Sequence, residues 1–235
     1  MTQATNRYWN DETEKKPEFR IPEDVVDLAF RINCPVLPLD HAHALSRQLL
    51  QALPWLEEEE HAGVHLIHGA ASGNGWFRPE DPGNEVLHLS RRTRMRLRIP
   101  QHRLDDARVL SGKTLDIDGH ALELGKTEVF LLSSLSTLFA RYVICREEDD
   151  EEQFLEEAAE QMRAIGINCR KLLGGITHKM SFPDGDVFTR SLMVADLEPE
   201  QSVRLQEVGL GAGRTIGCGL FIPHKGIKPV NDDKD

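Results

Sequence analysis

Leu138-Phe139-Ala140-Arg141-Tyr142-Val143-Ile144-Cys145, followed by residues 151–165, is the stretch that decides the fold. The first segment is rich in β-forming residues, and the second repeats apolar side chains at helical spacing. The same order opens the chain, where a strand over 25–32 precedes a helix over 41–53, and Asp40 is placed to cap that helix. The pattern therefore starts again after the polar joint 133–137.

Each half continues in the same order of elements. In the first half we expect strands over 64–68, 85–89, 92–99, 114–117, 122–124 and 129–132, and a helix over 101–109. In the second half we expect strands over 172–176, 179–182, 188–194 and 220–223, and a helix over 199–208. Each half then reads β-α-β-β-α-β, which is the ferredoxin-like order. The sequence predicts an α+β protein with a flexible leader (1–22), an N-terminal ferredoxin-like half (23–133), a C-terminal ferredoxin-like half (138–224) and a tail (225–235).

Bulk properties exclude several classes of protein. The chain has 235 residues and 40% hydrophobic residues, enough for a substantial core. No apolar run approaches the roughly 20 residues that span a bilayer, so we expect no membrane partner. The polar start is not a signal peptide, and a cytoplasmic location is expected by default. The four scattered cysteines form no CxxC pair, so we expect neither a zinc site nor a disulfide framework.

The formal net charge of −11 argues at first against nucleic acid as a partner. The acidic residues, however, gather in runs such as 57–60 and 147–152, which are typical of solvated faces. Residues 61–146 carry more Lys and Arg than Asp and Glu. Because binding depends on a local patch rather than the total charge, an RNA-binding role stays open.

Four arginines alternate with uncharged side chains in the expected strand over 92–99. They are Arg92, Arg94, Arg96 and Arg98. Alternation places them on one face of a strand, about 6–7 Å apart, which approximates the spacing of phosphates in nucleic acid. The alternative is an exposed sheet face neutralised by nearby carboxylates.

His41 and His43 open the first expected helix, where a cation is disfavoured and the imidazole tends toward its neutral form. A neutral imidazole can serve as a general base near pH 7. The alternative is a capping or surface histidine. Tyr142 and Lys179 are further candidates to stabilise a phosphorane.

Five glycines fall within residues 209–219: Gly209, Gly211, Gly213, Gly217 and Gly219. Successive backbone N–H groups in such a loop can form a concave anion site, and Arg214 stands among them. Too few residues follow for a dinucleotide-binding unit, and no Gly-Lys-Ser/Thr motif is present. The loop therefore indicates contact with a phosphate chain or, alternatively, a tight turn before the last strand.

Several stretches together resemble one known family. They are Leu-Pro-Leu-Asp-His-x-His-x-Leu (37–45), Gly-Val-His-Leu-Ile-His-Gly (63–69), Arg-Met-Arg-Leu-Arg-Ile-Pro (94–100), Gly-Lys-Thr-Leu-Asp-Ile-Asp-Gly (112–119) and Arg-Leu-Gln-Glu-x-Gly-Leu-Gly-x-Gly-Arg-x-x-Gly-Cys-Gly-Leu-Phe-Ile-Pro (204–223). The chain resembles, over about residues 24–224, the CRISPR repeat-processing endoribonucleases of Cas family six, and most of all their MYXAN subtype branch. The glycine motif is the most specific part of this resemblance.

The resemblance implies two ferredoxin-like halves related to RNA-recognition domains. It implies an enzyme without metal or cofactor that cuts precursor CRISPR RNA within each repeat by 2′-hydroxyl attack. The products would be a 2′,3′-cyclic phosphate and a 5′-hydroxyl. His41, or failing that His43, matches the catalytic position, and the glycine loop with Arg214 would lie against RNA.

The partners implied are the precursor transcript, the repeat stem of the mature guide and other Cas effector subunits, with no DNA bound directly. The chain departs from some branches in its acidic helix over 151–165 and in Leu49-Leu50, where others carry histidine. Two alternatives stay open: a subunit that holds the repeat hairpin without cutting it, and a metal-dependent hydrolase that uses the histidines.

Overall fold

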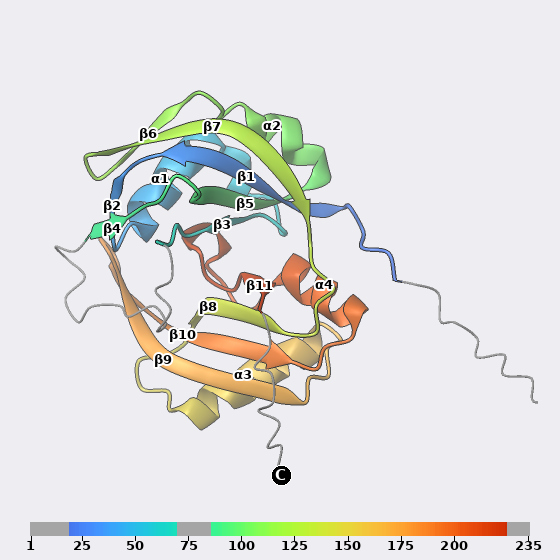
Figure 1. Ribbon diagram of the computed structural model, residues 1–235. Helices are drawn as coiled ribbons and strands as arrows, with labels where there is room; N and C mark the ends of the chain where they lie inside the picture. The colour runs from blue at the N-terminus through green and yellow to red at the C-terminus, as the bar shows by residue number, and fades with distance from the viewer. Residues whose placement is uncertain (1–18, 70–85, 225–235) are drawn as a thin grey trace, which may run out of the picture.

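The computed structural model describes residues 19–69 and 86–224. The predicted tail and all but the last residues of the predicted leader lie outside this part of the chain. Within it, two curled antiparallel sheets lie one above the other, and each is built from one half of the sequence (Figure 1). None of the helices in these residues is long and apolar enough to cross a membrane.

The first sheet has the strand order β3-β5-β1-β7-β6. Its strands are β1 (Val25–Asn33), β3 (Gly63–His65), β5 (Arg94–Pro100), β6 (Thr114–Ile117) and β7 (His120–Leu131). Helices α1 (Ala42–Ala52) and α2 (Leu104–Arg108) pack on one face of this sheet, where side chains of both helices join the core of β1 and β5. Without the added β6 hairpin, this is the order 2-3-1-4 of a ferredoxin-like unit.

The second sheet has the strand order β11-β8-β10-β9. Its elements are β8 (Leu138–Ile144), α3 (Glu151–Ala164), β9 (Lys171–Phe182), β10 (Gly185–Ala195), α4 (Pro199–Val208) and β11 (Phe221–Pro223). A capping box between Asp150 and Gln153 begins α3. The observed β-α-β-β-α-β order is the one that the restart at residue 138 predicted.

Short elements complete the structure. They are β2 (Val36–Pro38), which pairs with β4 (Val86–His88), and three 3₁₀ turns, η1 (Pro54–Glu57), η3 (Gln101–Arg103) and η4 (Arg214–Ile216). Several sequence expectations need correction here. The predicted strands over 122–124 and 129–132 are parts of one strand, β7. The helix α1 begins after His41 without a side-chain cap, because the carboxylate of Asp40 accepts instead from the Ser181 N–H at 3.0 Å. The segment around Gly174-Gly175 is one long strand, β9, rather than two.

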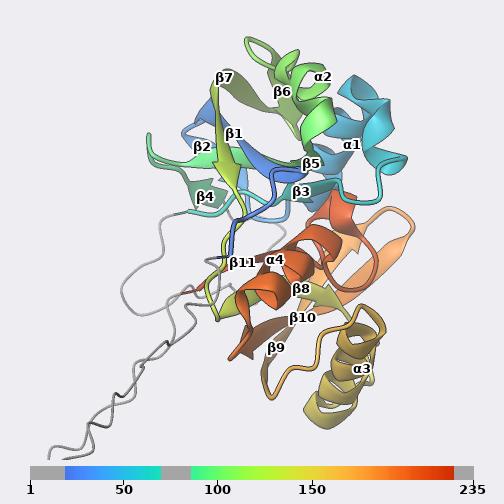
Figure 2. The same cartoon turned by 90° about the vertical axis from the view of Figure 1, so that its right-hand side faces the viewer.

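The face of the first sheet that carries no helix looks toward the second half, whose helix α4 and strand β11 lie next to it (Figures 1 and 2). On the first sheet, Leu28 and Leu97 belong to the core beneath the helices, while Asp27 and Arg98 point the other way, and Arg98 bonds to the second half. On the second sheet, Leu138 and Ala140 face the core with α3, so the intervening Phe139 lies on the opposite face. The space between the halves is therefore bordered by side chains of both sheets.

Candidate functional site

An open cavity of about 400 Å³ lies between the first sheet and β11. It is lined by Asp27, His65, Leu66, His68, Arg92, Thr93, Arg94, Arg96, Ile222 and Pro223. We call this cavity the cleft. It brings residues of β1, β3 and β5 together with the last strand of the other half, although these segments are more than a hundred residues apart in sequence.

The predicted arginine row supplies three cations to the cleft. Arg94 and Arg96 alternate along β5 with the buried Met95 and Leu97, as the strand period requires. Arg92 precedes β5 and lies in a turn rather than in the strand, but it lines the same cleft. The three guanidinium groups therefore form a positively charged wall.

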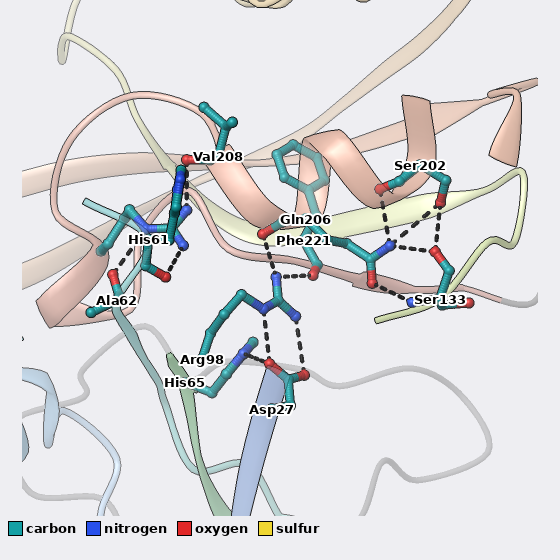
Figure 3. A network of polar contacts seen from close by, with 11 residues as sticks. Asp27, His61, Ala62, His65, Arg98, Ser133, Ser202, Gln206, Val208 and Phe221 are labelled. Atoms are coloured by element: carbon teal, nitrogen blue, oxygen red, sulfur yellow. Dashed lines mark hydrogen bonds and ion pairs between the residues drawn. The ribbon is translucent and has the colours of Figure 1, made fainter. Parts of the chain in front are cut away.

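Arg98 does not belong to this wall, which corrects the expectation that it contacts RNA. Its side chain is 0% exposed. It donates to both carboxylate oxygens of Asp27 at 2.8 and 3.1 Å, and to the backbone carbonyls of Gln206 and Phe221 at 3.0 and 2.8 Å (Figure 3). No carboxylate lies next to Arg98 along its own strand, whereas the antiparallel register places Asp27 opposite it on β1. Arg98 joins the halves.

The buried pair perturbs the acid–base behaviour of its neighbours. Burial alone would raise the pKa of Asp27, but the charge of Arg98 and the contacts of Asp27 with Arg98 and His65 outweigh it and hold the pKa well below its usual range. Burial lowers the pKa of His65, against the opposing effect of Asp27 at 3.5 Å, so this imidazole is neutral near pH 7. His65 thus borders the cleft as an uncharged group.

Arg214 is the second arginine that the structure uses internally. Its three guanidinium nitrogens donate to the carbonyls of Ala62, Val208 and His61, at 2.9, 2.7 and 2.9 Å. Burial lowers its pKa to about 10. These donors tie the glycine loop to the backbone before β3, and a contact of Arg214 with phosphate stays a prediction.

The glycines of the loop serve the protein's own packing. All five have positive φ angles, at Gly209, Gly211, Gly213, Gly217 and Gly219. A Cβ on Gly219 would collide with the carbonyl of Leu210, and one on Gly217 would lie 2.5 Å from Leu66 of the other half. Gly209 and Gly213 are similarly crowded, by Arg214 and Ile144 respectively. The crowding explains why glycine is needed at four of these positions, and their contact with RNA stays a prediction; among the five, Gly211 is the exposed one and has ordinary contact distances around it.

His41 is 2% exposed and held by the backbone through both ring nitrogens. Its Nδ1 lies 2.9 Å from the Pro38 carbonyl and 3.2 Å from the Leu39 carbonyl, so it must donate. Its Nε2 accepts from the N–H of Ile67 at 3.0 Å. A general base needs a lone pair directed at its substrate, so Nε2 would first have to release the Ile67 N–H, and the catalytic role of His41 stays a prediction.

His43 lies in the first turn of α1 and is half-buried. Its ring meets Phe182 of β9 edge-on, with centroids 5.7 Å apart. Lys179, the other cationic candidate nearby on β9, pairs with Asp186 at 3.0 Å, and this contact raises the pKa of the lysine. The catalytic role of His43 therefore stays a prediction. The positive charge of Lys179 is paired with the carboxylate of Asp186.

A group of aromatic rings gathers beside the cleft around Tyr142. The Tyr142 ring centroid lies 6.1 Å from that of His68 and 5.9 Å from that of His178. The register of β8 and β10 shifts between Arg190 and Leu192, which leaves Arg141 and Tyr142 together opposite one residue of β10. Such a bulge redirects a side chain, and here Tyr142 packs against Ala42 of the first half.

His68 is the titratable side chain shared by the three cavities at the junction of the halves. It lines the cleft, a cavity of about 50 Å³ with Arg141 and Tyr142, and a cavity of about 10 Å³ with His41 and Tyr142. Imidazole, phenol and guanidinium groups are the ones that phosphodiester cleavage by acid–base chemistry requires. In the part of the chain that the structure describes, no group of three or more His, Cys, Asp or Glu is placed to hold a metal ion.

The sequence did not single out His68, His178 or Arg141. The sequence signal for His68 was its place at the end of the predicted strand over 64–68, three residues beyond His65. That spacing could not show that the other half would bring Tyr142 and His178 to it, because the contact spans both halves.

Comparison with known proteins agrees with the predicted resemblance. The family model described as Cas6 Crispr matches residues 26–226. The CRISPR-associated endonuclease Cas6 of Myxococcus xanthus (strain DK1622) is 34% identical over 203 residues, which cover 84% of this chain and 81% of that protein.

Among solved structures, a Cas6-related protein from Pyrococcus furiosus superposes with a TM-score of 0.56 at 11% identity, covering 84% of this chain and 97% of the other. A CRISPR-associated protein Cas6 gives a TM-score of 0.55 at 10% identity, covering 86% and 100%. At these identities the likeness concerns the fold alone, and it confirms the predicted tandem ferredoxin-like arrangement.

The loop glycines provide a matched test of packing. Gly219→Ala and Gly211→Ala both place a side chain at positive φ, which costs about 1–2 kcal/mol. Only the Gly219 substitution also collides with backbone. We expect it to lower the free energy of unfolding by about 1–3 kcal/mol more than Gly211→Ala, measured by urea denaturation. Equal losses would show that Gly219 has room for a side chain.

The ionised state of Asp27 should make stability depend on pH. Because its folded pKa lies below the unfolded value of about 3.9, the stabilisation is complete above that value and is lost as pH falls below it. The free energy of unfolding of Asp27→Asn should therefore fall below that of the wild type by about 3–5 kcal/mol near neutral pH. The difference in free energy of unfolding between the two proteins should become smaller as the pH falls below about 3.9.

Asp105→Asn is the control, because Asp105 is exposed and pairs with Arg108 at the surface. It should show little effect at any pH. A gap for Asp27→Asn that is as wide in acid as at neutral pH would contradict the buried ionised pair.

Proposed function

This chain belongs to the Cas6 family of CRISPR-associated endonucleases, and from that premise we propose that it cuts precursor CRISPR RNA within the repeats by attack of a 2′-hydroxyl, without a metal ion. Its enzyme class, an endoribonuclease of CRISPR RNA maturation, follows from the family and from the 34% identical relative. The single observation that supports the mechanism is the position of His68, between Tyr142 and the arginines of the cleft.

The reaction needs three things that the cleft residues can supply. A base removes the proton of the 2′-hydroxyl, and the 2′ oxygen attacks the adjacent phosphorus. The bond from phosphorus to the 5′ oxygen breaks, and an acid returns a proton to that oxygen. The products are a 2′,3′-cyclic phosphate and a 5′-hydroxyl, and the atoms balance without a further reactant.

We assign the proton transfers to His68, with the ring of His178 on the other side of Tyr142 as the second imidazole. Arg94 and Arg96 would bind phosphates on either side of the cut, because guanidinium groups match phosphate oxygens in charge and geometry. They would also stabilise the extra negative charge of the phosphorane. His43 is the alternative for the base, since it is half-buried in the first turn of α1.

Three finer points complete the proposal. The cut RNA stays bound through its repeat stem, other Cas effector subunits join that complex, and the chain does not bind DNA directly. The exposed part of the glycine loop around Gly211 is the part available to RNA. The acidic helix α3 packs on the helix-bearing face of the second sheet, away from the cleft, and takes no part in gripping the stem.

The mechanism predicts one cut in repeat RNA that persists in excess EDTA. A 2′-deoxy substitution at the nucleotide 5′ of the cut removes the nucleophile, so it should abolish cleavage while binding is retained. Product ends are read by phosphatase sensitivity and mass spectrometry, and binding by gel shift. Cleavage of the deoxy RNA, or its loss in EDTA with rescue by a divalent ion, would overturn the mechanism. Tight binding without any cut would favour a subunit that only holds the hairpin.

Substitution of His68 tests the assignment of the base. Because general acid–base catalysis contributes about 10²–10⁴-fold, His68→Ala should lower the single-turnover rate by that order while the Kd for repeat RNA stays near the wild-type value. Tyr142→Phe keeps the ring that His68 contacts and should lose less. If His43→Ala abolishes cleavage and His68→Ala does not, His43 is the base.

A further inference from the structure

Each half carries an arginine above a phenylalanine on the helix-free face of its sheet. In the first half, Cζ of Arg96 lies 5.1 Å from the centroid of the Phe130 ring. In the second half, Cζ of Arg141 lies 5.9 Å from the centroid of Phe139. The proposed acid–base chemistry uses neither phenylalanine, so it does not explain the two pairs.

The first pair bridges three strands. Ala29 of β1 lies between Arg96 of β5 and Glu128 of β7, and Asp27 lies opposite Phe130. The small side chain of Ala29 lets the guanidinium extend diagonally across β1 to the ring. Phe130 is 37% exposed, an unusual position for a phenylalanine next to a charged cleft. The pair therefore presents a flat apolar surface and a cation to the space between the halves.

The second pair lies across from the first. Phe139 pairs with Met193 of β10 and Ile222 of β11, and its ring centroid is 5.8 Å from that of His224. Nε of Arg141 is buried and has no hydrogen-bond partner among the residues that the structure describes. This donor would be satisfied by an acceptor brought by a ligand.

The two arginines border adjoining cavities. Arg96 lines the cleft together with His65, His68 and Ile222, and Arg141 lines a smaller cavity with the same three residues. Both arginines are thus neighbours of His68, and each has its phenylalanine beside it. A ligand that reaches His68 through the cleft comes close to both arginines.

The chemistry of the pairs suits unpaired nucleobases. Bases stack on aromatic rings and on guanidinium planes, and sheet-face aromatics are a common means of binding single-stranded RNA. Bases inside an A-form duplex are stacked on each other and are not free for such contacts.

We propose that Phe130 with Arg96 and Phe139 with Arg141 form a two-sided stacking platform that binds unpaired nucleotides next to the scissile phosphate. The proposal rests on the proposed function in that the ligand is RNA. It adds that recognition depends on a single-stranded segment in the cleft, and that Phe130 and Phe139 determine this specificity.

The test uses the full chain, a labelled single-stranded oligouridine of about ten nucleotides and a blunt RNA duplex as probes. Phe130→Leu and Phe139→Leu keep apolar bulk and remove the ring. Each should weaken oligouridine binding by about 5- to 150-fold, as expected for one lost base stack. Duplex binding should stay unchanged. Phe130→Trp keeps a stacking surface and should retain affinity, which separates loss of stacking from loss of folding.

Two controls sharpen the result. Leu135→Ala removes an exposed apolar side chain outside the cleft and should bind both probes like the wild type. Arg94→Gln should lower the slope of log K against log salt by about one, whereas the phenylalanine variants should leave the slope unchanged. Unaltered oligouridine binding in the Phe→Leu variants, or equal losses for both probes, would overturn the platform. If stacking on oligouridine holds but repeat RNA is not cut, the platform stands and the proposed function fails.

Discussion

The ion pair of Arg98 and Asp27 is the contact on which the relation between the halves depends. The guanidinium is fully buried and donates four hydrogen bonds. Two go to the carboxylate of Asp27 on the neighbouring strand, and two go to backbone carbonyls of α4 and β11. Asp27 neutralises the charge within the first half, whereas the two carbonyl acceptors come from the second half. Displacement of the second half would leave the buried Nη1 donors of Arg98 without partners, which is unfavourable. The pair therefore fixes where β11 lies relative to β5, and the cleft is the space between those strands.

The glycine loop fixes the same junction from the other side. Arg214 donates to the carbonyls of His61 and Ala62, directly before β3. The side chain of Leu66 packs against Gly217, and the side chain of Leu220 packs against Gly63. These interlocking contacts position the segment that carries His65 and His68. The loop acts on the candidate site indirectly, through the backbone that it positions, which explains why it is rich in glycine although most of its glycines face protein rather than solvent.

The sequence was sufficient to predict features that depend on neighbouring residues along the chain. It was not sufficient to predict those that depend on contacts between distant segments or between the halves. The restart at Leu138 predicted the second ferredoxin-like unit, because strand and helix periodicity are local properties. The alternation in residues 94–98 matches the face of β5 that Arg94, Arg96 and Arg98 share, whereas Arg92 lies in the turn before the strand. It could not show that Asp27 and two carbonyls would bury Arg98, because those partners come from other strands. The same limit applies to His41, whose partner Ile67 is 26 residues away, and to His68, whose ring neighbours lie in the other half.

The burial of Arg98 and Arg214 changes how a chain with a net charge of −11 can bind RNA. Of the arginines in the cleft and its adjoining cavity, Arg92, Arg94, Arg96 and Arg141 remain for a ligand. The acidic α3 packs behind the second sheet, and charges on opposite sides of a protein are largely screened beyond about 8 Å at physiological salt. The overall negative charge then repels RNA outside the cleft. The few cleft arginines attract RNA only after it has entered the cleft. With so few cations, part of the affinity for RNA has to come from uncharged contacts. The rings of Phe130 and Phe139 lie beside Arg96 and Arg141, where such contacts would be made.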